Sequence, residues 1–377
     1  MKTWQKNISL LAIAALIIIA ALAVVASLRG LLPERLIAFG GKEQSIAAID
    51  PVRMDAVVIT QRWLPATFYV NHEKIRSRTV QLSLSDSRSH FQYGNTFIWC
   101  NQQCAQYDTD CGRLLVQTID KKRMTVLTVY NTATGKAVWT VFEHSRCAGI
   151  ALSGDGRFVA AAGMDSANVW DIKTGHQICH LPSVNSSNVA FSPDDSILYV
   201  CGEVNDQMAK SVKHTWVTDT SEDTSDWYPG YVEAWHVSGR RLLWRDYVTS
   251  GSFDVHASSD GRFLAICGPT GGGDFYSWKL TGGMSQALVV DAATGAAKWA
   301  SPQADFEVNA FSPNGRFTAF FGTGSCCLVD LQSMKQVRLY TVPFLSKYGG
   351  RVSFTTDSKH LIGAGSGQAA EWYIGDI

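Results

Sequence analysis

Three short motifs in this sequence bring chemistry-bearing residues close together. Residues 268–274, Gly-Pro-Thr-Gly-Gly-Gly-Asp, are rich in the glycine that phosphate-binding loops need. They lack the Lys and the Ser or Thr of such a loop, and no helix pattern follows, so a flexible insertion is expected. His176 and His180 are four residues apart, but they fall in or beside a strand, where this spacing does not form a pair of metal ligands. No Cys-x-x-Cys-His occurs, so covalently bound haem is not indicated.

These motifs therefore give no catalytic residue, no metal site and no cofactor. The sequence Gly363-Ala-Gly-Ser-Gly367 does not place Ser at the centre of a nucleophile elbow, and it lies where a strand ends. We predict a protein that is not an enzyme.

Two other segments concentrate aromatic side chains among polar residues. Residues 203–230 and 269–284 contain six of them: Trp216, Trp227, Tyr228, Phe275, Tyr276 and Trp278. The first segment also carries an acidic run, which matches no calcium-loop motif. Aromatic side chains on loops are costly in water unless they pack together or meet a partner. The two readings are a pair of loops that cover each other and a binding rim for a protein or peptide.

A repeat positions these segments. Five stretches share one 13-residue pattern of strand, turn and strand: ALSGDGRFVAAAG (151–163), AFSPDDSILYVCG (190–202), HASSDGRFLAICG (256–268), AFSPNGRFTAFFG (310–322) and SFTTDSKHLIGAG (353–365). Ser or Thr at the third position can bond nearby backbone, and Asp or Asn at the fifth tolerates tight turns. Gly at the sixth position accepts positive φ. The apolar runs are short enough for strands and too short for helices.

A second strand–turn–strand pattern follows most copies, and one copy precedes them: it begins at residues 127, 168, 233, 288 and 327. Four of these turns contain Gly, at Gly135, Gly175, Gly239 and Gly295. Two strand pairs per repeat predict a four-stranded antiparallel sheet. Repeats of about 40 residues are typical of propeller blades. The two aromatic-rich segments lengthen their repeats between the second and third strands, so both should emerge on one face.

The motifs FSPDD, FSPNG, SGDGRF and Val169-Trp170-Asp171 resemble the WD-repeat family, over about residue 125 to the C-terminus. The Gly-His dipeptide of that family is missing from its usual place in the repeat, and Trp-Asp occurs once. Asp291 to Trp299 also resembles the repeat of quinoprotein propellers, which bind pyrroloquinoline quinone (PQQ), and Trp139 and Trp244 share its Trp position. Adjacent cysteines form a redox ring in some of those enzymes, which is why Cys326-Cys327 is of interest. Two strand residues facing opposite sides of a sheet are the alternative.

Both resemblances imply an all-β propeller of four-stranded blades. Length predicts seven blades, with six as the alternative. Because the last repeat ends after its third strand, an N-terminal strand should close the ring, and residues 56–60 are the expected one. The predicted domains are an anchor at 1–30, a linker at 31–55 and the propeller at 56–377.

The N-terminus predicts a membrane anchor. Ile8 to Leu28 contains no charged residue and is long enough to span a bilayer as one transmembrane helix. A cleaved signal peptide, ending near residue 26, is the alternative. The short flank in front resembles a signal-anchor and predicts a single-pass protein with its propeller on the extracytoplasmic side. The cysteines leave the compartment open, because Cys100, Cys104 and Cys111 could form a disulfide whereas the others resemble buried strand residues.

Charge and repeat together predict the function. Thirty-three basic and 33 acidic residues give zero net charge, so no field exists to attract nucleic acid. We therefore expect a membrane-anchored, non-catalytic scaffold that binds a protein or peptide through the aromatic-rich loops. The alternative is an exported quinone-type oxidoreductase or a carbohydrate-binding propeller.

Overall fold

The structure is a computed structural model of the chain. It describes residues 35–38, 44–50, 55–61, 77–83, 89–92, 105–108 and 112–119, and most of 125–377 apart from gaps. The largest gaps are 205–228, 269–286 and 343–350. The predicted anchor, Ile8 to Leu28, and the cluster Cys100, Cys104 and Cys111 lie outside the described residues. No helix in the described part of the chain is long and apolar enough to cross a membrane.

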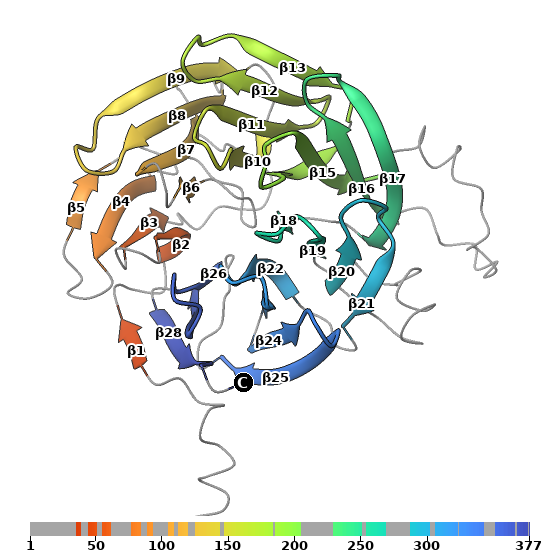
Figure 1. Cartoon of the computed structure of the whole chain (residues 1–377). Coiled ribbons are helices and arrows are strands. Elements are labelled where there is room, and N and C mark those ends of the chain that lie inside the picture. Colours follow the sequence, from red (N-terminus) through yellow and green to blue (C-terminus); the bar gives the residue numbers. More distant parts are fainter. Residues whose placement is uncertain are drawn as a thin grey trace, which may run out of the picture.

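The described strands form seven four-stranded antiparallel sheets arranged as the blades of a ring (Figure 1). Blade 1 contains β2 (Gln44–Asp50), β3 (Asp55–Gln61), β4 (Ser77–Ser83) and β5 (Ser89–Gln92). Blade 2 contains β6 (Ala105–Asp108), β7 (Arg113–Ile119), β8 (Thr125–Asn131) and β9 (Ala137–Glu143). Blade 3 contains β10 (Cys147–Leu152), β11 (Phe158–Gly163), β12 (Ala167–Asp171) and β13 (Gln177–Leu181).

The remaining blades follow in chain order. Blade 4 contains β14 (Ser186–Phe191), β15 (Ile197–Glu203), β16 (Pro229–His236) and β17 (Arg241–Ser250). Blade 5 contains β18 (Asp254–Ala257), β19 (Phe263–Cys267), β20 (Ala287–Asp291) and β21 (Ala297–Ala300). Blade 6 contains β22 (Phe306–Phe311), β23 (Phe317–Gly322), β24 (Ser325–Asp330) and β25 (Lys335–Thr341). Blade 7 contains β26 (Arg351–Phe354), β27 (His360–Gly365), β28 (Gln368–Tyr373) and β1 (Arg35–Ala38).

The strand that closes the ring is not the expected one. β1, residues 35–38, pairs antiparallel with β28 and completes blade 7. Residues 56–60 belong instead to β3, where they pair with both β2 and β4 inside blade 1. The prediction of closure near 56–60 is therefore wrong, and the propeller begins within the predicted linker. An apolar strand can pair on two sides, so local sequence does not distinguish a second strand from a closing one.

The turn between the first and second strands is held by its own side chains, as the repeat predicts. In blade 3, Ser153 Oγ donates to Asp155 Oδ1 at 2.8 Å and accepts from Phe158 N at 2.8 Å. The sixth position has positive φ in all five repeats: Gly156, Asp195, Gly261, Gly315 and Ser358. The turn residues thus satisfy the backbone locally, which stops the hairpin at the same length in blades 3 to 7.

The turn between the third and fourth strands uses a different cap. Asp171 Oδ1 accepts from Thr174 N at 2.9 Å, and Asp330 Oδ1 accepts from Ser333 N at 2.8 Å. Gly175 and its equivalents in blades 2 and 5 have positive φ. In blade 4 the positive φ falls on Arg240 and not on Gly239.

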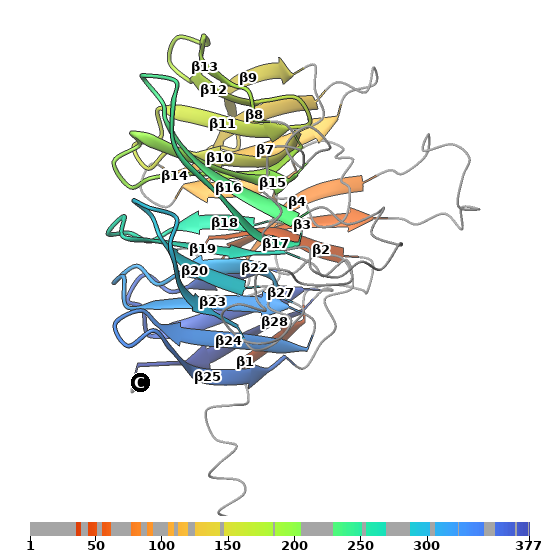
Figure 2. The same ribbon diagram turned by 90° about the vertical axis from the view of Figure 1, so that its right-hand side faces the viewer.

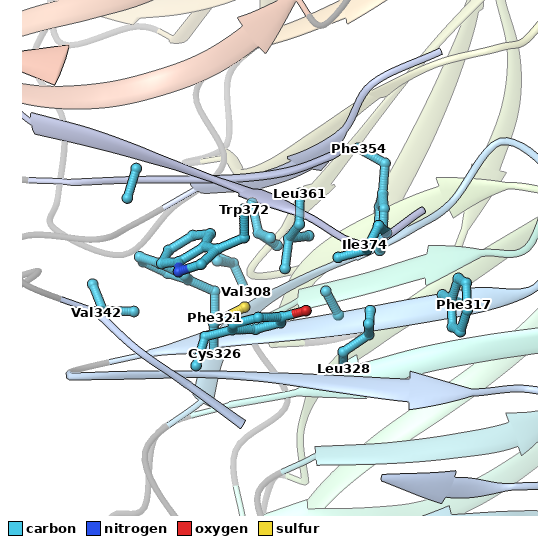
Figure 3. Close-up of a cluster of buried hydrophobic side chains, with 14 residues drawn as sticks. Val308, Phe317, Phe321, Cys326, Leu328, Val342, Phe354, Leu361, Trp372 and Ile374 are labelled. Carbon is cyan, nitrogen blue, oxygen red and sulfur yellow. The ribbon is translucent and has the colours of Figure 1, made fainter. Parts of the chain in front are cut away.

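The core consists of apolar layers between neighbouring blades. The Trp position of the fourth strand bridges to the next blade, because Trp139 lies 6.4 Å from the ring of Trp170 and Trp299 stacks 5.5 Å from Phe320. Between blades 6 and 7, Phe321 and Trp372 lie in one buried cluster (Figure 3). Each blade therefore buries its apolar faces only with its neighbours in place.

The ring has two distinct ends, seen at left and right in Figure 2. We call the end that carries the first–second and third–fourth strand turns the turn face, and it lies at the left of that view. The opposite end, where second strands lead to third strands, we call the insertion face. The C-terminus lies at the turn face.

Candidate functional site

The two aromatic-rich insertions begin and end at the insertion face. The first connects β15 to β16 in blade 4, and the second connects β19 to β20 in blade 5. These blades are neighbours, since β14 and β18 are in contact. The predicted place of both insertions, between the second and third strands of successive blades, is confirmed. The six aromatic residues predicted to bind a partner lie outside the described residues: Trp216, Trp227, Tyr228, Phe275, Tyr276 and Trp278.

The root of the first insertion is well packed. β15 and β16 pair continuously up to Glu203, which lies opposite Gly230. Val204 and Tyr231 are fully buried and pack with Tyr247. Burial raises the pKa of Glu203. The insertion therefore leaves the blade from a strand pair that is complete without it.

The adjacent cysteines do not form a redox ring. Cys326 belongs to the apolar cluster between blades 6 and 7, beside Phe321 in Figure 3. Cys327 belongs to the cluster between blades 5 and 6. Neither side chain is exposed, and burial raises the pKa of both thiols, to about 12 for Cys327. The pair therefore lies on opposite faces of β24, the alternative that the sequence left open.

The two histidines that are four residues apart, His176 and His180, have different surroundings. His180 Nδ1 is 2.8 Å from Asn168 Oδ1, whereas His176 is exposed in the preceding turn. Within the described residues no group of three metal-ligating side chains comes together.

The buried carboxylate of Glu233 joins blades 3 and 4. Its oxygens accept from Ser183 Oγ at 2.5 Å and Trp235 Nε1 at 2.7 Å, and form an ion pair with Arg245. All of its partners are donors within the sheet interface, so the charge is satisfied there. Glu233 thus holds two blades together.

A second buried carboxylate, Asp254, lies in a polar row across three innermost strands. Asn188 Nδ2 donates to Asp254 Oδ1 at 2.8 Å. Asn309 donates to Asp254 Oδ2 from its backbone N at 2.7 Å and from Nδ2 at 3.1 Å. The innermost strand of each blade has one edge without a strand partner, so its N–H groups need other acceptors. Asp254 is such an acceptor for the N–H of Asn309, across the boundary between blades 5 and 6.

His256 follows Asp254 on the same strand and the same side. Its Nδ1 lies 3.4 Å from Asp254 Oδ2, and about a third of the side chain, 32%, is exposed. Desolvation lowers the pKa of His256, but the charge of Asp254 and hydrogen bonding outweigh it, and the pKa is raised overall. Asp254 therefore stabilises the protonated imidazole.

This His–Asp pair was not among the residues predicted from the sequence, although the repeat carries a signal for it. The first position of the 13-residue pattern is Ala or Ser in four copies and His only at 256: Ala151, Ala190, His256, Ala310 and Ser353. A larger, titratable residue at a position that is small in the other repeats indicates that this blade has a feature the others lack.

Comparison with known proteins establishes the fold. No protein-family model matches the chain, and no curated protein matches it. Among solved structures, a chain of the mitotic checkpoint complex is similar, with a TM-score of 0.63 and 13% identity over 91% of this chain and 92% of that chain. As many as 1343 solved chains match, so the likeness selects no single function. It does show that this chain is a β-propeller, as the WD-repeat resemblance implied.

Proposed function

We propose that this protein is a non-catalytic scaffold that binds a protein or peptide partner through the two insertions, and that Ile8 to Leu28 anchors it in a membrane. The observation that carries the proposal is that both insertions start from adjacent blades at one end of the ring. Loops with a common base can act together as one binding surface, and six aromatic residues are available there.

The chemistry of the described interior supports a non-catalytic role. Glu233 and Asp254, two of the buried carboxylates, are each bonded to donors from a neighbouring blade. These hydrogen bonds explain both carboxylates as links between blades. The hydrophobic clusters between the blades are apolar packing, which explains stability and not turnover.

The similar chain from the mitotic checkpoint complex supports a protein as the class of partner, because that propeller is found in an assembly of proteins. We extend this class of partner to the present chain as part of the proposal. The propeller would face the extracytoplasmic side, as the short N-terminal flank indicates.

The decisive experiment measures partner binding and stability on the same variants. Partners are captured from native membranes with the full chain, and affinity is then measured for the captured protein. Trp227→Ala should weaken binding by about 30-fold or more, because central aromatic residues dominate interfaces. The melting temperature should stay near that of the unaltered protein.

Phe142→Ala is the matched control, because Phe142 is an aromatic residue exposed on the outer strand of blade 2. Its loss should leave both measurements unchanged. If Trp227→Ala lowers the melting temperature and leaves affinity unchanged, the insertions form a small core of their own and the proposal is wrong.

The anchor has a separate test. Carbonate extraction should leave the full chain in the membrane pellet, and a chain lacking residues 1–30 should be soluble. Detection of a mature N-terminus near residue 27 by mass spectrometry would replace the anchor with a cleaved signal peptide.

A further inference from the structure

A cavity of about 250 Å³ opens at the end of the central channel on the turn face, opposite the insertions. The innermost strands of blades 2 to 5 contribute to its wall, and apolar side chains, including Leu152, Val189 and Phe191, form most of it. Sites for drug-sized ligands usually exceed 300 Å³. The cavity is therefore sized for a small molecule or for one side chain of a partner.

The polar groups that remain available in this cavity are hydrogen-bond donors. Gln106 Oε1 accepts from Leu152 N at 2.9 Å, which fixes the orientation of the amide and leaves its NH₂ group toward other partners. The hydroxyls of Ser192, Ser258 and Ser259 already donate to acceptors in the turns. Gln106 and His256 are thus the side chains that can offer N–H groups to a ligand.

The charges around His256 favour an anion. Asp254 on the same strand engages Nδ1 and stabilises the protonated imidazole, so Nε2 is left as the donor not used by Asp254. Arg351 on β26 is close enough to act on the imidazole as a second positive charge. Asn309 on β22 faces the same group and is neutral. Among the residues that line the cavity, His256 is the one titratable side chain, so the charge that the lining itself presents is that of the protonated imidazole.

Carboxylates on the turns beside the cavity do not reverse the preference of the His256 region for an anion. Asp195 accepts from the backbone N–H groups of Gly154 and Asp155, and Asp260 accepts from Ser258 and Arg262. Asp260 is exposed on its turn, as are Asp155 and Asp194 on theirs, so salt screens these charges more than it screens the inner wall. Asp195 is half-buried, and the two backbone N–H groups offset its charge.

We propose that this cavity binds a carboxylate carried on a short apolar stem, with Gln106 and His256 donating to the carboxylate and the apolar wall covering the stem. The carboxylate belongs either to a free small acid or to a residue of a protein partner. This site lies at the opposite end of the channel from the insertions and is independent of the partner site proposed there.

Nuclear magnetic resonance (NMR) titration of the full chain with butyrate tests the proposal. Saturable shifts are expected at the His256 ring and at the Gln106 side-chain amide. His176 and His180, in blade 3, serve as internal references and should not move. Butyrate should also raise the pKa of His256, because an anion binds its protonated form better. Its affinity should fall as pH rises through that pKa.

Variants and analogues make the result specific. Gln106→Leu and His256→Gln should each weaken butyrate by about tenfold, the usual effect of losing a charge-assisted hydrogen bond. His176→Gln is the matched control and should not change affinity. Butyramide should bind more weakly than butyrate, and butylammonium should not bind. Equal shifts from butyrate and butylammonium, or no saturable shift from butyrate, would overturn the proposal.

A short peptide with a free C-terminal valine, compared with its amide, distinguishes the two sources. Tighter binding of the peptide acid than of butyrate assigns the cavity to a partner's carboxylate. Binding of butyrate without the peptide acid assigns it to free small acids. If neither acid binds, the site does not exist.

Discussion

At the turn face, five successive repeats stop their hairpins with the same side-chain bonds, whereas at the insertion face the connections range from residues 323–324 in blade 6 to residues 204–228 in blade 4. Both ends belong to the same strands and bound the same core. The difference shows that local hydrogen bonds restrict the length of the connections at the turn face. At the insertion face, only the close approach of the strands restricts them. The turn face therefore maintains the fold, and the insertion face is available for variation.

Gly202→Ala should give the largest effect, because it acts where the insertion face is packed most closely. A Cβ at this position would lie 2.3 Å from Asn185 O and 2.8 Å from Ser186 Cα, both backbone atoms. We expect a loss of about 3 kcal/mol in the free energy of unfolding, measured by chemical denaturation. Gly175→Ala is the control at the turn face, where nothing lies within 4 Å and only a φ of +72° is strained. It should cost about 1–2 kcal/mol. Equal losses would mean that strand approach does not constrain the insertion face.

Ser258→Ala should give the next largest effect and tests the bonds of the turn face. Ser258 is fully buried and its hydroxyl accepts from Phe263 N at 3.0 Å, so its removal leaves that N–H without this acceptor. We expect a loss of about 1–2 kcal/mol, because Phe263 is half-buried. Ser259→Ala, one residue along and exposed, should change stability by less than about 0.5 kcal/mol. Thermal melting of the two variants side by side is sufficient, and a similar result for both would argue against local capping.

Asp195→Asn tests the first–second strand turn of blade 4, which among the five repeats is the one with a charged residue at the sixth position. Burial raises the pKa of Asp195, against the two backbone N–H groups that lower it, and the charge of Asp155 adds to the rise. A carboxyl with a raised folded pKa binds its proton more readily in the folded state, so its contribution to stability falls as pH increases from 3.8 through that pKa. The variant loses this dependence. Its stability relative to the unaltered protein should therefore improve with pH across that window in melts at stepped pH, and a constant difference would contradict the raised pKa.

Replacing residues 206–227 with a short Gly-Ser linker should have the smallest effect on stability. β15 and β16 remain paired from Ile197 opposite His236 to Glu203 opposite Gly230, and the cluster of Val204, Tyr231 and Tyr247 is retained. We expect the free energy of unfolding to change by less than about 0.5 kcal/mol. A large loss would show that the insertion is part of the fold and would remove the contrast between the two faces.

The sequence by itself determined the blade, and the reason is that the blade is a local structure. Ser153, Asp155 and Gly156 show it: residues within a few positions of one another satisfy the turn, so their spacing could be interpreted without the rest of the chain. The positions of both insertions followed from the same spacing.

Only the tertiary structure decided which distant residues meet. β1 and not residues 56–60 closes the ring, because several apolar strands could pair with β28 and the choice depends on the whole ring. Asp254 meets Asn188 and Asn309 from different blades, and Gln106 and His256 reach one cavity from strands 150 residues apart in the sequence. Contacts of this kind depend on the closure of seven blades around a channel, and no local pattern of hydrophobicity or turn residues specifies them.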